Sequence, residues 1–252
     1  MLADKAFFEN LYKKYNNRSY AFSDPISLVY NYEKNHLDAE IAGLIASSLA
    51  YGNVKQILKS LGKVFLVMGK SPRLYLEKKK NHEIAKDFLS FKHRFTTGGE
   101  LTVFLINIKK VLIKYGTLEN LFVKNIREEE KNYIGCLYRF VNELNYSACA
   151  PTLTPCPEKK SSFKRFNLYL RWMIRKDKID LGVWKNISPK GLIIPLDTHM
   201  LSISQKLGIT KRKDGSMKTA EEITSFFRKI NPQDPVKYDF SITRTGILKN
   251  FK

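Results

Sequence analysis

At 252 residues with 43% hydrophobic residues, the chain is long enough to bury a sizeable core, as one domain or two closely packed lobes. Forty-four Lys and Arg against 24 Asp and Glu give a net charge of +20. This excess favours a polyanionic partner (DNA, RNA or an anionic membrane surface), although a high charge is also a general habit of the proteins of some organisms. The N-terminus is charged and amphipathic rather than a signal sequence, no apolar run approaches the roughly 20 residues that span a bilayer, and three cysteines lack metal-site spacing (Cys136, Cys149 and Cys156). We therefore expect a reduced, cytoplasmic monomer with no metal or cofactor and no membrane partner.

The first third of the chain predicts helices, because apolar side chains recur at intervals of three and four residues. These helices span residues 3–15, the segment after Asp24-Pro25, residues 39–51 and residues 54–69. Asp38 suits the N-cap of the third helix, whose small and apolar faces predict a central position. Tyr51 and Asn53 lie at the corner that follows. An aromatic ring and an amide at such a corner can fill the gap left by an extruded base, or they simply close the turn.

The remainder of the chain continues the helical pattern, with no convincing alternation of a β-strand. Residues 71–95 predict a polar, basic surface, and residues 145–162 predict an irregular loop that forms the wall of a pocket. Capping signals predict helices from Thr219 and from Asp234-Pro235. Helices are expected at residues 101–115, 118–125, 129–144, 163–175, 198–207, 219–230 and 236–248. The fold class is therefore predicted to be all-α.

Two segments near the end of this pattern carry candidate chemistry at their N-terminal ends. Residues 163–175 predict a helix with an apolar face and a basic face, the latter formed by Lys164, Arg171 and Arg175. Asp197 has the side chain of an N-cap, and Gly208 supplies a stop for the helix that follows it. Lys164 falls in a first turn, where the helix dipole disfavours an ammonium ion, as a nucleophilic amine requires.

Lys164 and Asp197 are 33 positions apart, and the intervening chain is long enough to bring the two helix starts together. A lysine beside an aspartate can attack C1′ of a nucleoside and hold the imine, while the carboxylate stabilises an oxocarbenium-like sugar and helps to move protons. The alternative is a solvated lysine beside an aspartate that only caps its helix. His199, two residues later, is most simply a packed or capping side chain. Asp239 either faces the same pocket as Lys164 or is an ordinary surface carboxylate.

The segment Pro195-Leu196-Asp197-Thr198-His199 resembles the catalytic-aspartate segment of the helix-hairpin-helix DNA glycosylases, the superfamily of endonuclease III and 8-oxoguanine glycosylase. The wider frame, KRFNLYLRWMIR followed by LIIPLDTHMLSISQKLGI and DPVKYDF, resembles a bacterial family placed in that superfamily and extends over most of the chain. The resemblance implies a single two-lobed helical domain over residues 1–252, with a flipped nucleotide in a cleft between the lobes.

The same resemblance implies roles for individual residues. Lys164 matches the lysine that forms the Schiff base, and Asp197 matches the helix-capping aspartate. Asp239 resembles an acidic residue that contacts the base, and Tyr51 with Asn53 resembles the corner that fills the duplex. Further DNA contacts are expected at Arg165, Arg171 and His199.

The chain departs from the superfamily pattern in two ways. The usual L-P-G-x-G hairpin before the lysine is absent, and the interval from lysine to aspartate is longer than the usual twenty or so residues, similar to that of the archaeal 8-oxoguanine glycosylase branch. The cysteine cluster of endonuclease III is also missing. The resemblance implies a glycosylase with β-lyase activity that removes an oxidised purine such as 8-oxoguanine from double-stranded DNA. The alternatives are a non-catalytic nucleic-acid-binding protein, and a monofunctional glycosylase in which Asp197 activates water and Lys164 binds phosphate.

Overall fold

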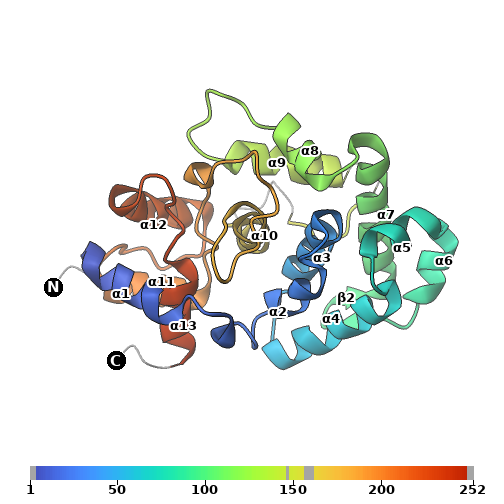
Figure 1. The fold of residues 1–252 in the computed structure, drawn as a ribbon, viewed down its shortest axis with the longest axis horizontal. Helices are drawn as coiled ribbons and strands as arrows, with labels where there is room; N and C mark the ends of the chain where they lie inside the picture. Colours follow the sequence, from blue (N-terminus) through green and yellow to red (C-terminus); the bar gives the residue numbers. More distant parts are fainter. Residues whose placement is uncertain (1–3, 146–147, 156–161, 249–252) are drawn as a thin grey trace. The chain divides into compact units, whose positions relative to one another are not determined.

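Helices dominate the computed structural model, which describes residues 4–145, 148–155 and 162–248 (Figure 1). Thirteen α-helices and one two-stranded antiparallel sheet lie in these ranges, so the all-α prediction is confirmed. Within the same ranges, no helix is both long and apolar enough to cross a membrane. Cys156 and much of the predicted loop at 145–162 lie outside the described residues.

The chain divides into two compact units. The central unit comprises Phe22–Glu130 and Ile134–Lys159, and the terminal unit comprises Met1–Ala21, Lys131–Tyr133 and Lys160–Lys252. The first helix of the chain therefore belongs with its C-terminal third. Each unit has its own buried side chains and is described separately.

The central unit is built around one buried helix, α3. Its elements are α2 (Ile26–Val29), α3 (His36–Ser48), α4 (Val54–Met68), α5 (Pro72–Lys78), α6 (Asn81–Asp87), β1 (Lys92–His93), β2 (Thr96–Thr97), α7 (Gly98–Tyr115), α8 (Leu118–Lys124) and α9 (Ile134–Leu144). Every residue of α3 from Asp38 to Ser48 is buried, which confirms its predicted central position. Two of these residues are carboxylates that hold other helices: Asp38 accepts from Arg73 N at the start of α5 (2.9 Å), and Glu40 accepts from Leu118 N at the start of α8 (3.0 Å).

In the central unit, the sequence predictions are wrong at the ends of some helices. They also do not include several short elements. The N-cap of α3 is Asn35, whose side chain accepts from Leu37 N, because Asp38 is engaged by α5. The polar stretch at 71–95 contains α5, α6 and β1, the first strand of a β-hairpin whose register pairs His93 with Thr96. Seven-residue helices and two-residue strands are too short to show a period in the sequence. The helix expected from residue 129 begins at Ile134.

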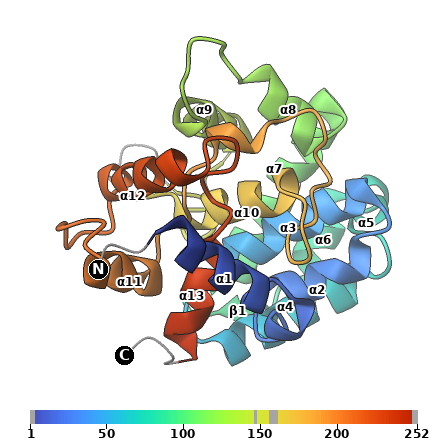
Figure 2. The ribbon, with the colours of Figure 1, turned by 60° about the vertical axis from the view of Figure 1, so that its left-hand side comes forward.

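The terminal unit gathers helices from both ends of the chain. Its elements are α1 (Lys5–Tyr15), α10 (Lys164–Ile174), α11 (Thr198–Lys206), α12 (Met217–Ile230) and α13 (Asp239–Ile247). Helix α13 packs against both α1 and α11 (Figures 1 and 2). The fully buried ring of Phe8 contacts Phe227 and Tyr238, with centroids 5.0 and 5.6 Å apart, and Tyr238 Oη donates to Glu9 (2.7 Å). These contacts dock α1 on the core of this unit, as predicted.

Two helix starts in the terminal unit differ from the prediction. Helix α12 is capped by Ser216, because the hydroxyl of buried Thr219 donates to Asp214 instead (2.9 Å). The last helix begins at Asp239, and the preceding residues form turns in which Lys237 N donates to Asp234 O. The Asp234 side chain does not cap a helix there, because it is paired with Arg175 (2.9 Å).

Candidate functional site

The starts of α10 and α11 meet in the terminal unit. Lys164 is the first residue of α10 and Asp197 is the N-cap of α11, and Lys164 Nζ lies 3.8 Å from Asp197 Oδ2. The distance is that of an ion pair and is longer than a hydrogen bond. The side chains keep 40% and 20% of their surface exposed, so both are open to a ligand. The predicted approach of the two helix starts is confirmed, while the role of each side chain stays a prediction.

Asp197 is held by the helix that it caps. Its backbone is extended (φ −112°, ψ 179°) and Oδ1 accepts a hydrogen bond from Met200 N at 2.7 Å, as its sequence position predicted. Because one carboxylate oxygen is committed to the helix, the other is fixed in orientation toward Lys164. The cap therefore positions the carboxylate whether or not it takes part in chemistry.

Lys164 is placed by a strained residue that sequence reasoning missed. Phe163 adopts a left-handed conformation (φ 51°), which is uncommon for a bulky residue, and it caps α10 without a side-chain hydrogen bond. Buried Asn167 holds this bend, because its Nδ2 donates to Ser162 O (2.9 Å) and its backbone N donates to Phe163 O (2.8 Å). Strain of this kind is concentrated at functional sites, where the surrounding structure maintains it.

The predicted basic face of α10 is wrong. Arg171 and Arg175 are both only 3% exposed and form a buried network of ion pairs. Arg171 pairs with Asp180 (3.1 Å) and with Asp239. Arg175 pairs with Asp180, with Asp177 (3.0 Å) and with Asp234 (2.9 Å). Arg171 is therefore not a contact for DNA phosphates, because its guanidinium is enclosed by carboxylates beneath the surface.

Asp239 lies at the end of this network, close to Asp197. It is 2% exposed, so the alternative of an ordinary surface carboxylate is wrong. Its Oδ1 has no hydrogen-bond partner among the described residues. Burial raises the pKa of Asp239 to about 6 against the opposing effect of Arg171, and the negative charge of Asp197 adds to the rise. Lys164, Asp197 and Asp239 thus form one electrostatic cluster, in which Asp239 is the buried member.

The remaining predicted residues of the terminal unit lie beside this cluster. His199 is exposed on the first turn of α11 and lies against α13, where its Nδ1 is 3.3 Å from the position of a Cβ added to Gly246. Arg165 is half-buried in the first turn of α10. The roles of both residues in binding DNA stay predictions.

Tyr51 and Asn53 belong to the central unit and have structural partners there. Tyr51 Oη donates to His93 O (2.9 Å) and lies 2.7 Å from Thr96 Oγ1 in the β-hairpin. Asn53 is exposed and caps α4 by accepting from Lys55 N (2.9 Å). The turn-closing alternative therefore describes what both side chains do in this structure, and contact with DNA stays a prediction.

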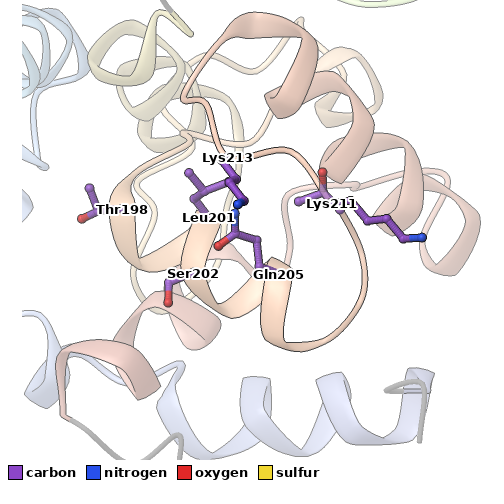
Figure 3. Close-up of a pocket in the computed structure, with 7 residues that line it drawn as sticks. Thr198, Leu201, Ser202, Gln205, Lys211 and Lys213 are labelled. Carbon is purple, nitrogen blue, oxygen red and sulfur yellow. The ribbon is translucent and has the colours of Figure 1, made fainter.

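A shallow pocket lies on α11 (Figure 3), and its first lining residue, Thr198, follows Asp197 in the chain. It is lined by Thr198, Leu201, Ser202 and Gln205 of α11 and by Thr210, Lys211 and Lys213 of the following loop. Neither Lys164 nor Asp197 lines it. Because these two side chains carry the candidate chemistry, we place the site at the helix starts rather than in this pocket.

Comparison with known proteins places the chain in a family without assigning it an activity. No curated protein matches it, and no solved structure matches it. One family model, described as "Protein of unknown function (DUF2400)", matches residues 24–248, which include Lys164, Asp197 and Asp239. The chain therefore belongs to the DUF2400 family.

Proposed function

We propose that this protein is a DNA glycosylase with β-lyase activity that removes an oxidised purine, such as 8-oxoguanine, from double-stranded DNA. The observation that carries the proposal is the approach of Lys164 Nζ to Asp197 Oδ2 at 3.8 Å, at the starts of two helices. The net charge of +20 supports a polyanionic substrate. The resemblance around Asp197 supports the reaction class.

In the proposed reaction, the amine of Lys164 attacks C1′ of the flipped nucleotide, and the bond from C1′ to the base nitrogen breaks. The base leaves with the bonding electrons and takes up a proton. Asp197 stabilises the positive charge that develops on the sugar, and its free Oδ2 lies where it can accept the proton that the attacking amine releases. The sugar ring then opens, as the C1′–O4′ bond breaks and O4′ takes up a proton, which gives the imine. Loss of a proton from C2′ expels the 3′ phosphate by β-elimination.

Asp239 has a separate role in this proposal. Burial raises its pKa to about 6, and its unpaired Oδ1 is a polar atom for recognition of the extruded base close to Asp197. Arg171 is then a positioning residue, because its ion pair fixes Asp239 from below.

Borohydride trapping tests the proposal. Incubating the protein with damaged duplex and sodium borohydride reduces an imine to a stable covalent adduct, which Lys164→Gln is expected to abolish. Lys176→Gln is a control in the same unit, because its Nζ donates to the backbone at Leu181 O (2.8 Å) and no catalytic role is proposed for it. Base release without strand cleavage or trapping would instead indicate the monofunctional alternative. Binding of DNA with no base release from any oxidised lesion would indicate the non-catalytic one.

A further inference from the structure

An uninterrupted row of lysines runs along the outer face of α4 in the central unit. Lys55, Lys59 and Lys63 follow one another at steps of four, which places them on a single stripe of the helix. All three are exposed, and α4 contains no acidic residue. Like charges at this spacing destabilise a helix, so the row is not explained by the stability of α4.

Gly62 lies on the same stripe, three residues after Lys59 and one before Lys63. A Cβ added there would meet nothing within 4 Å, so packing does not require a glycine. A glycine inside a helix destabilises it relative to other residues, but it leaves the backbone uncovered for a ligand to approach closely. The stripe therefore combines three cations with an open stretch of backbone.

The β-hairpin, which packs against α4, carries an exposed aromatic ring. Its two-residue turn is Arg94-Phe95, and the Phe95 side chain is 74% exposed with the Arg94 guanidinium 5.6 Å from its ring centroid. Arg94 takes a left-handed conformation (φ 51°) at a turn position that normally favours glycine. The strained turn thus presents a cation and a large ring at its tip.

Several contacts fix the hairpin against the start of α4. His93 Nδ1 lies 3.0 Å from Ser60 Oγ in the middle of α4, and Figures 1 and 2 both place the hairpin beside this helix. The Arg94 side chain lies over Gly52, where a Cβ would be 2.5 Å from Arg94 Cδ. The hydroxyl of Tyr51 binds both strands, as described above. Tyr51 therefore holds the hairpin in place through its hydroxyl, and the exposed ring at the turn of the hairpin is Phe95.

We propose that the stripe Lys55–Lys59–Gly62–Lys63 binds the phosphate backbone of duplex DNA and that Phe95 stacks on an exposed base at the end of this surface. A row of lysines is complementary in charge to the row of phosphates along a DNA strand. An exposed aromatic ring on the adjoining hairpin supplies a surface on which a base can stack. The choice of DNA as the partner rests on the proposed function. Leu66, which is 84% exposed, follows Lys63 on the same face, so an anionic membrane is the competing occupant that the test must separate.

Salt-dependent binding to an undamaged fluorescent duplex of about 20 base pairs tests the phosphate contacts. Changing Lys55, Lys59 and Lys63 together to Gln is expected to reduce the slope of log K against log salt by about 2.7, since each contact contributes about 0.9 on B-DNA. The matched control changes three exposed lysines on other helices of the same unit to Gln, Lys78, Lys86 and Lys110, and is expected to keep the wild-type slope. Equal slopes for the two triple variants would overturn the assignment of the surface.

Two further variants separate binding from folding. Gly62→Leu is expected to raise the melting temperature and weaken DNA binding, a combination that a purely structural residue would not produce. Phe95→Ala is expected to weaken binding to a duplex with an unpaired base at least about fivefold while leaving the salt slope unchanged. Unchanged affinity in both variants would overturn the roles of Gly62 and Phe95.

The outcomes also distinguish this inference from the proposed function. If the wild type forms the borohydride adduct and the α4 variant binds DNA like its control, the surface is wrong and the glycosylase proposal stands. Lysine-dependent binding to phosphatidylserine vesicles without binding to duplex would overturn the inference in favour of a membrane surface.

Discussion

Two substitutions of Asp197 separate its role as a helix cap from any role in chemistry. In the wild type, Met200 N donates to Asp197 Oδ1 at 2.7 Å. Asp197→Asn keeps an oxygen that can accept this hydrogen bond, whereas Asp197→Ala removes it. Asn and Asp are equivalent N-caps, and replacing either with Ala costs about 1 kcal/mol. We therefore expect urea unfolding to show a loss of about 1 kcal/mol for Asp197→Ala and little change for Asp197→Asn.

The catalytic effect of the same substitutions is expected to follow a different order. The ion pair at 3.8 Å is partly exposed, so its own contribution to stability is at most about 1 kcal/mol. Removing a carboxylate that stabilises charge in the transition state costs about 100-fold or more in rate. Both variants should therefore lose at least about 100-fold in the single-turnover rate of base release, measured with enzyme in excess over lesion-containing duplex.

The comparison that matters is Asp197→Asn, which loses the charge and keeps the cap. A rate within a few fold of the wild type for this variant, beside a slower and less stable Asp197→Ala, would refute the catalytic role. Asp197 would then be a cap only, and the 3.8 Å pair would be a consequence of the two helix starts meeting.

Three further predictions concern the buried groups and the hairpin anchor. Arg171→Met is expected to lower the free energy of unfolding by about 3–5 kcal/mol, because it leaves the buried carboxylates of Asp180 and Asp239 without their cationic partner. Adding Asp239→Asn should recover part of this loss in a double-mutant cycle, and fully additive effects of the two substitutions would contradict the pairing. Burial raises the pKa of Asp239 from its usual value near 3.8 to about 6. Between about pH 4 and 6 the folded state therefore retains a proton that the unfolded state has lost. The stability of the wild type relative to Asp239→Asn should therefore fall as pH rises through this window, by up to about 3 kcal/mol in urea titrations, and a constant difference would contradict the shift. Tyr51→Phe should lower the unfolding free energy by about 1–3 kcal/mol, because Thr96 N and His93 O lose their partner, and an unchanged urea midpoint would show that the hydroxyl does not anchor the hairpin.

The long helices were predictable from the sequence because a period of 3.6 residues is visible over three or more turns. Helix caps were harder, and two errors share a cause. Asn35 and Asp38, like Ser216 and Thr219, are pairs of suitable caps three residues apart. The first of each pair caps the helix, since the second is engaged elsewhere: Asp38 by the start of α5 and Thr219 by Asp214. Local preference identifies the pair, and tertiary contacts choose between its members.

The candidate site shows the same division between local and long-range information. Asp197 was predictable as a cap because its partner, Met200 N, is three residues away. The burial of Arg171 was not predictable from the spacing of α10, because its partners Asp180 and Asp239 lie 9 and 68 residues away. The strained bend at Phe163 carries no signal in the sequence, since glycine is the residue that normally marks a left-handed conformation.

Lys164 is the proposed nucleophile. The chain contains 33 lysines, so loss of trapping in a variant does not by itself identify the reacting amine. Digesting the borohydride-reduced adduct and sequencing the DNA-linked peptide by mass spectrometry locates that amine directly. We expect a single modified peptide carrying the sugar remnant on Lys164. An adduct on any other lysine, or on the N-terminal amine, with Lys164 unmodified would contradict it.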